Sequence, residues 1–179
     1  FTIEKYREQI KTNQTDKDGN VVALYTSDQG RQDGFIQPAL KRSYDVLILD
    51  SPIDSHYINL LERKVEKFNL KRVDSDTIDK LINKDAKTES ILSEEEQKTV
   101  KEVFEKTINN SNMKVSLEPL SAEEFPVTIT MPEFMRRMQD MAMTGGMGMM
   151  GKMPEQFNVA VNANHHMIRK ITTATDDEK

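Results

Sequence analysis

Cysteine is absent from the sequence, and so is any run of about 18 apolar residues. Without cysteine the chain forms no disulfide and presents no thiolate to a metal or a substrate. Without a long apolar run, no membrane-spanning helix is expected. The first residues also lack the basic and then apolar pattern of a secretion signal. These absences favour a cytoplasmic protein that does not bind membranes.

The sequence also lacks an excess of positive charge. The 30 Asp and Glu residues outnumber the 25 Lys and Arg residues, so the net charge is -5. A chain with this balance has no general attraction to nucleic acid. Its 179 residues suffice for one ordinary domain or for two small ones with a core each. The first residue is Phe1 instead of a methionine, and we expect the chain to be a piece of a longer protein.

Methionine, in contrast, is concentrated in one stretch. Nine of the 11 methionines lie between residues 131 and 153. Pro132 suits the first position of a helix and two glycines at 145–146 end one, so we predict a helix over residues 132–143. Its apolar residues fall on one arc at helical spacing, and Glu133, Arg136 and Asp140 fall on the other side. The arc holds Phe134, Met135, Met138, Met141 and Ala142.

Methionine side chains are flexible and polarizable, and they suit surfaces that adapt to different apolar partners. The glycines and methionines that alternate over residues 145–151 cannot pack densely as a core. Two interpretations are open at this point. In one, the helix packs into its own domain and a loop follows. In the other, helix and loop form an adaptable apolar surface that receives other polypeptides.

The first part of the chain has the pattern of a small α/β layer. Continuous apolar runs at residues 21–25 and 46–49 are typical of strands that are buried on both faces, and residues 70–73 form a third predicted strand. Strands that alternate with helices at this spacing predict a parallel sheet. We therefore expect a small parallel α/β layer over residues 1–74.

Two helices are expected between these strands. The first covers residues 35–42, with Pro38 in its first turn. The second follows Asp54, which can cap it. The apolar stripe of the second helix is expected at Tyr57, Leu61, Val65 and Phe68.

A second unit with a different pattern follows a short helix and linker at residues 75–92. Ser93 and Glu96 form a capping box that opens a helix. Alternation of apolar and polar residues then predicts half-buried strands, which we expect to pair as a short antiparallel sheet. These strands are residues 113–117, 127–131 and 157–161. The fold class is thus α/β plus α+β, with the α+β unit over residues 93–179 carrying an exposed amphipathic helix.

No catalytic or metal site is predicted. Asp50 and Asp54 follow a predicted strand at the edge where open α/β sheets bind ligands, and the strand resembles the phosphoacceptor strand of receiver domains. Receiver domains also need an acidic pair after the first strand and a lysine after a late strand. Residues 25–28 supply one acid at most, and the predicted layer has too few strands. A turn at Asp50 and a helix cap at Asp54 explain both residues without a ligand. His165 and His166 are adjacent, so their side chains point in different directions and are poorly placed to chelate one ion.

The strand and turn at residues 44–54, Tyr-Asp-Val-Leu-Ile-Leu-Asp-Ser-Pro-Ile-Asp, closely resemble the heat-shock protein 90 family of chaperones, and most of all its bacterial type. Residues 2–6, Thr-Ile-Glu-Lys-Tyr, and the apolar run at 21–25 occur in the matching order. The resemblance covers essentially the whole chain. It implies that residues 1–74 are the small α/β subdomain at the end of the family's middle domain, and that residues from 93 begin its C-terminal domain.

The resemblance implies an ATP-driven, dimeric chaperone of the heat-shock response that binds partly folded client proteins. ATP and Mg²⁺ would be bound before Phe1, and the homodimer would form through helices after Lys179. The chain itself is therefore expected to hold no cofactor and to be no enzyme. The family carries an exposed amphipathic helix with apolar residues facing its central cleft. Carried over to this sequence, the client-binding residues are Phe134, Met135, Met138, Met141 and Met143.

Two other functions remain open. The segment over residues 146–154 also resembles the methionine-rich loop of the signal recognition particle protein, which binds signal peptides. That domain is all-helical and basic because it also holds RNA. Alternatively, the methionine stretch is a structural contact between subunits, since apolar patches also form permanent interfaces.

Overall fold

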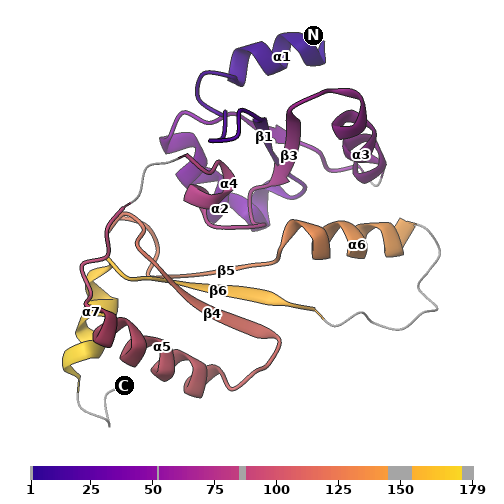
Figure 1. The fold of residues 1–179 in the computed structure, drawn as a ribbon. Coiled ribbons are helices and arrows are strands. Elements are labelled where there is room, and N and C mark those ends of the chain that lie inside the picture. The colour runs from indigo at the N-terminus through magenta and orange to yellow at the C-terminus, as the bar shows by residue number, and fades with distance from the viewer. Residues whose placement is uncertain (1, 52, 85–87, 145–154, 175–179) are drawn as a thin grey trace. The chain divides into compact units, whose positions relative to one another are not determined.

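The chain forms two compact units (Figure 1). The computed structural model describes all residues except 1, 52, 85–87, 145–154 and 175–179, and for residues 140–144 it describes the backbone without the side chains. The first unit comprises Phe1–Asp85 and Pro132–Met153, and the second comprises Ala86–Met131 and Pro154–Lys179. The domain boundaries expected around residues 75–92 stay a prediction.

A three-stranded parallel sheet with the order β2-β1-β3 forms the centre of the first unit. Its strands are β1 (Val21–Thr26), β2 (Val46–Ile48) and β3 (Phe68–Arg72). Every residue of β1 is buried, because helices cover both faces of the sheet. The parallel α/β layer that the continuous apolar runs predict is confirmed.

Helices α1 (Ile3–Ile10) and α3 (Asp54–Lys64) pack on one face of this sheet. Helices α2 (Gln29–Lys41) and α4 (Ile78–Leu81) pack on the other face. Figure 1 shows the two pairs on opposite sides of the strands. Alternate residues of β1 therefore enter two separate cores, one on each face.

Helix α2 begins earlier than the sequence predicts. Asp28 is its N-cap and accepts a hydrogen bond from the N–H of Arg31 at 3.0 Å. The buried side chain of Gln32 accepts a hydrogen bond from the N–H of Ser27 at 3.0 Å and so fixes the first turn. Pro38 consequently lies inside the helix, and the prediction that it occupies the first turn is wrong.

Two further expectations, both about helix α3, are wrong. Asp54 is its first residue instead of its N-cap, and its carboxylate closes the preceding turn by accepting from the N–H of Ser51 at 2.9 Å. Tyr57 is 47% exposed, although the predicted apolar stripe placed it on the buried face. Ile58 and Leu61 form that face because they point toward the sheet.

The second unit contains a mixed sheet with the order β4-β6-β5. Its strands are β4 (Met113–Glu118), β5 (Val127–Thr130) and β6 (Phe157–Asn162). Strands β5 and β6 pair antiparallel as predicted, whereas β4 and β6 pair parallel. The prediction of an antiparallel sheet is therefore wrong for one of the two pairs. Alternation of apolar residues indicates which face of a strand is buried, and it carries no information on the direction of the neighbouring strand.

Helices α5 (Glu94–Ile108) and α7 (His166–Thr173) complete the second unit. Their apolar residues share one core with β4 and β6, centred on Val100, Val115 and Val161. The capping box that opens α5 is present as predicted. Within the described residues, no helix combines the length and the apolar character needed to cross a membrane.

Candidate functional site

The methionine stretch forms helix α6 (Glu133–Thr144), which belongs to the first compact unit. Its candidate residues differ in exposure. Phe134 is 69% exposed. Met135 and Met138 are half-buried. Met141 and Met143 lie in the helix, but their side chains fall outside the described part, as does the whole loop over residues 145–153.

The charged side of α6 is bound to α3. Arg137 donates from Nη1 to Glu62 Oε2 at 2.5 Å and from Nη2 to Glu62 Oε1 at 3.0 Å, which is a bidentate ion pair. The same guanidinium donates from Nε to Glu133 Oε1, one turn earlier in α6, at 2.9 Å. We refer to Glu62, Glu133 and Arg137 as the charged cluster.

The charged cluster also binds the backbone of β3, which is an edge strand. The N–H of Leu70 donates to Glu62 Oε1 at 2.8 Å, and the N–H of Arg72 donates to Glu133 Oε2 at 3.0 Å. The carbonyl oxygen of Leu70 accepts from Arg137 Nη2 at 2.8 Å. These backbone groups point away from β1, so the three side chains satisfy the outer edge of the sheet.

The charged cluster is largely withdrawn from water, with side-chain exposures of 21% for Glu62, 19% for Glu133 and 22% for Arg137. The hydrogen bonds to Glu62, and after them those to Glu133, raise the pKa of Arg137. Tyr25 donates its hydroxyl to Glu133 Oε1 at 3.1 Å. Burial, with the negative charge of Glu133 in addition, raises the pKa of Tyr25 well above its usual range.

A second set of contacts lies beside the charged cluster. Arg136 Nη2 donates to Asp74 Oδ2 at 2.8 Å. The Asp74 carboxylate is almost completely buried, and it also accepts from Arg72 Nε and from Gln32 Nε2, both at 2.8 Å. A buried carboxylate is stable when hydrogen bonds and positive charge surround it in this way. Asp74, which follows the end of β3, is thus a second point at which α6 is fixed to the first unit.

These contacts determine which side of α6 is bound. The side bound to the sheet carries Glu133, Arg136 and Arg137. At about 100° per residue, Phe134 and Met138 lie on a different side of the helix. The exposure of Phe134 agrees with this geometry. The sequence pattern placed Glu133 and Arg136 on the charged side, as observed, but it did not include Arg137 and it did not identify the partners of that side.

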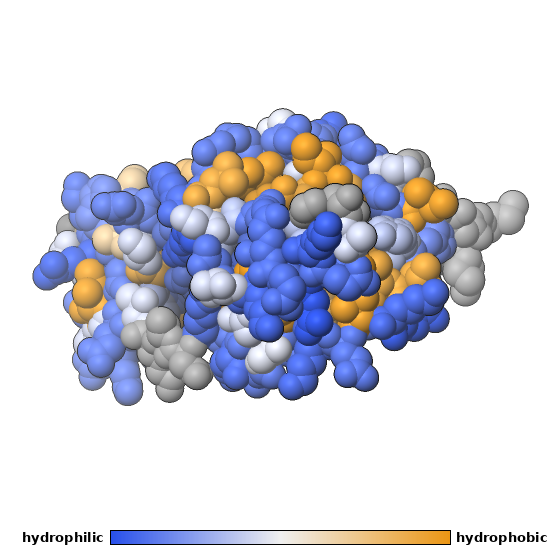
Figure 2. All heavy atoms as spheres, turned by 90° about the horizontal axis from the view of Figure 1, so that it is seen from above, coloured by the Kyte–Doolittle hydropathy of each residue, from blue (hydrophilic) through white to orange (hydrophobic). Residues whose placement is uncertain are grey.

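Apolar residues also reach the surface outside α6. Figure 2 shows hydrophobic residues in several patches among hydrophilic ones. On α3 and at its N-cap, Ile53 is 68% exposed, Tyr57 47% and Leu60 41%. Their spacing of four and three residues places them on one side of the helix. The sequence contains this spacing, but the prediction assigned Tyr57 to the core and so missed the stripe.

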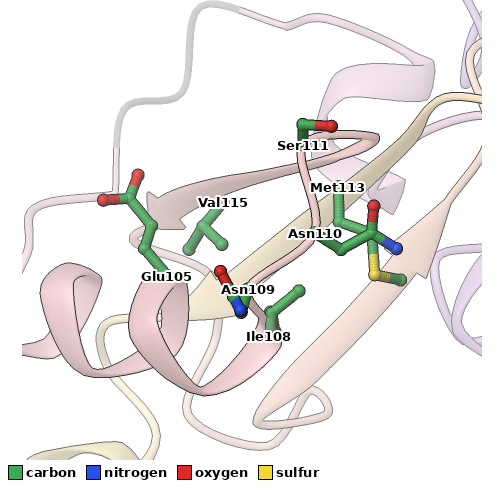
Figure 3. A pocket seen from close by; sticks show the side chains of 7 residues that line it. All are labelled: Glu105, Ile108, Asn109, Asn110, Ser111, Met113 and Val115. Carbon is green, nitrogen blue, oxygen red and sulfur yellow. The ribbon is translucent and has the colours of Figure 1, made fainter.

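The second unit contains a hollow of about 530 Å³ at the C-terminal end of α5 and the start of β4. Figure 3 shows its lining, in which Ile108, Met113 and Val115 contribute apolar side chains and Glu105 contributes a carboxylate. The loop over residues 109–111 contributes the polar remainder of the lining. These groups are not arranged as an acid and base pair or as a nucleophile with a base, so the hollow does not indicate a catalytic site.

The two adjacent histidines have structural contacts. His165 is the N-cap of α7 and accepts from the N–H of Met167 through Nδ1 at 3.2 Å. The rings of His165 and His166 lie 4.4 Å apart between centroids. In the part of the chain that the structure describes, no group of three or more His, Cys, Asp or Glu side chains is placed to hold a metal ion.

Comparison with known proteins finds no matching family model. Among curated proteins, the chain is 41% identical over 175 residues to the chaperone protein HtpG of Porphyromonas gingivalis, covering 96% of this chain and 26% of the relative. It is 38% identical over 175 residues to HtpG of Bacteroides thetaiotaomicron, with the same coverage. For HtpG of Bacteroides fragilis the identity is 36% over 183 residues, covering 100% of this chain and 27% of the relative. The chain thus spans about a quarter of the length of the relatives it matches.

Proposed function

Because the chain belongs to the heat-shock protein 90 family, in its bacterial HtpG type, we propose that it is a client-binding part of a molecular chaperone. Partly folded proteins bind to the apolar arc of α6, which consists of Phe134, Met135, Met138 and Met141, and to Met143 at the C-terminal end of the helix. The observation that carries this proposal is the 69% exposure of Phe134 on a helix whose charged side is already bound to the sheet.

The chemistry of the arc suits weak binding to many sequences. Burying one large apolar side chain stabilises a complex by about 1.5 to 3 kcal/mol before the entropy of association is subtracted. A short arc therefore binds a polypeptide weakly and reversibly. Unbranched methionine side chains repack around clients of different shape. Because such contacts do not depend on one shape, the arc binds many different polypeptides with little specificity.

The longer protein supplies the remaining functions in this proposal. The relatives are about four times as long as this chain, and an ATP-dependent cycle with Mg²⁺ belongs to parts of the protein outside it. We assign no residue of this chain to the nucleotide, to Mg²⁺ or to a catalytic step. A cytoplasmic location and a homodimer formed by other helices complete the proposal.

Signal-peptide binding finds less support. The domain that the methionine-rich loop resembles is all-helical and basic, whereas strands β5 and β6 flank the methionine stretch in this chain. The net charge of -5 also opposes RNA binding. An RNA gel-shift assay separates the two functions, because retention of RNA by the chain would favour the targeting function.

The proposal predicts that replacing Met135, Met138 and Met141 together with serine weakens binding of an unfolded polypeptide about tenfold, or about 1.4 kcal/mol. The reason is that serine removes the apolar surface but not the helix. The measurement is fluorescence anisotropy with labelled, reduced and carboxymethylated lactalbumin. Met167→Ser is the matched control, because Met167 is 55% exposed on α7. Equal affinity of the triple variant and the control contradicts the proposal.

The alternative function, in which the same arc forms a contact between subunits, predicts a different result. The chain would then sediment as a dimer, and Met138→Glu would convert it to a monomer because a buried charge without a partner destabilises an interface. A monomer at all concentrations, together with polypeptide binding that Met138→Glu abolishes, supports client binding instead.

A further inference from the structure

The contacts of the charged cluster follow the geometry of a strand edge. Along β3, Leu70 and Arg72 point their N–H groups outward, two residues apart, which is the period of a strand. One carboxylate from α3 and one from α6 accept these donors, and the Arg137 guanidinium donates to the carbonyl oxygen of Leu70. The three side chains therefore occupy the place that a fourth strand would take beside β3.

Arg137 connects the parts of this arrangement. It belongs to α6 and binds a carboxylate from α3, a carboxylate from its own helix and a backbone carbonyl of β3. The planar guanidinium fixes both distance and angle, because its N–H groups point in set directions. A lysine at the same place would supply the charge without this geometry.

We propose that Arg137 is a positioning residue for client binding: held by Glu62 and Glu133 against the outer edge of β3, it fixes α6 so that Phe134 and Met138 are presented away from the sheet. This inference rests on the proposed function. It adds that the affinity of the apolar arc depends on a residue outside the arc, whose side chain is bound to α3 and β3. A helix held in one orientation binds more tightly than a loose one, because less conformational entropy is lost on binding.

The test compares two readouts in the full 179-residue chain. In Arg137→Gln, amide hydrogen exchange of Leu70 and Arg72 should accelerate about tenfold, while exchange in β1 stays unchanged. Binding of the carboxymethylated lactalbumin should weaken about fivefold. Lys64→Gln is the matched control, since it removes one positive charge at an exposed position of α3, and it should alter neither readout.

Two further variants keep the test decisive. Arg137→Lys retains the positive charge, and it replaces Arg137→Gln in the test if circular dichroism shows that Arg137→Gln does not fold. We expect Arg137→Lys to bind the polypeptide more weakly than the unaltered chain, with less than half of the affinity lost in Arg137→Gln restored. The double variant Glu62→Arg and Arg137→Glu reverses the ion pair. It should bind the polypeptide more tightly than Arg137→Glu alone, because opposite charges face each other again.

The possible failures are distinguishable. Faster exchange at Leu70 and Arg72 with unchanged polypeptide binding overturns the positioning role and leaves the proposed function intact. Unchanged exchange in Arg137→Gln also overturns it, because the edge of β3 would not depend on Arg137. If Phe134→Ser binds as tightly as the unaltered chain, the proposed function fails, and the inference falls with it.

Discussion

At the scale of single residues, Tyr25 is the most informative group. It is 4% exposed near the C-terminal end of β1, and its hydroxyl donates to Glu133 Oε1 at 3.1 Å. Burial, and after it the charge of Glu133, raises the pKa of Tyr25, so the neutral phenol is retained in the folded chain. This contribution to stability is fully present below the ordinary phenol value of 10.0. It is lost as the pH rises above that value, because only the unfolded chain then releases the proton.

Tyr25→Phe should therefore have two effects. At neutral pH it should lower the free energy of unfolding by about 1.5 to 3 kcal/mol, since a hydrogen bond to a charged acceptor is lost. Above pH 10 the stability of the variant should fall less steeply than that of the unaltered chain. Urea unfolding at several pH values checks both effects. Tyr57→Phe is the control, because Tyr57 is 47% exposed, and an identical pH slope for Tyr25→Phe and the unaltered chain would refute the linkage.

At the scale of elements, α5 shows how far local sequence determines structure. The hydroxyl of Ser93 accepts from the N–H of Glu96 at 3.3 Å, and the Glu96 carboxylate accepts from the N–H of Ser93 at 2.8 Å. These reciprocal bonds satisfy free donors of the first turn and lower the pKa of Glu96. Both partners lie within four residues, and so this start was predictable from the sequence.

Ser93→Ala should destabilise the second unit by about 1 kcal/mol, because one cap hydrogen bond is lost. Thermal or urea unfolding followed by circular dichroism measures the change. Ser111→Ala, in the exposed loop after α5, should have an effect within about 0.5 kcal/mol. If the two substitutions have equal effects, the capping box does not stabilise α5.

Elements whose partners lie far away in the sequence were predicted less well. The first turn of α2 depends on Gln32, whose amide donates to Asp74, and no local pattern indicates that pair. Strand β6 pairs with both β4 and β5, and the parallel pair joins segments about forty residues apart. Glu133 and Arg136 were assigned to the charged side of α6, but Arg137 was not. The partners Glu62 and Asp74 were not identified either, since an ion pair leaves no periodic signal.

At the scale of the whole molecule, two findings agree. The resemblance inferred from residues 44–54 and the identities of 36–41% to HtpG relatives place the chain in one chaperone family. The structure adds a helix whose charged side is bound to a parallel sheet and whose Phe134 is exposed. Because the charged side is already bound, the other side of α6 is the one that we propose as the binding surface for apolar polypeptides.

Site-specific photocrosslinking tests the binding of apolar polypeptides to α6 most directly. p-Benzoylphenylalanine would replace Phe134 in one chain and Leu40, which is 51% exposed on α2, in another. Both chains are irradiated with the labelled, carboxymethylated lactalbumin. Crosslinks from position 134 that exceed those from position 40 at least fivefold are the predicted result. Equal yields at the two positions, or no crosslink at position 134, would contradict client binding by α6.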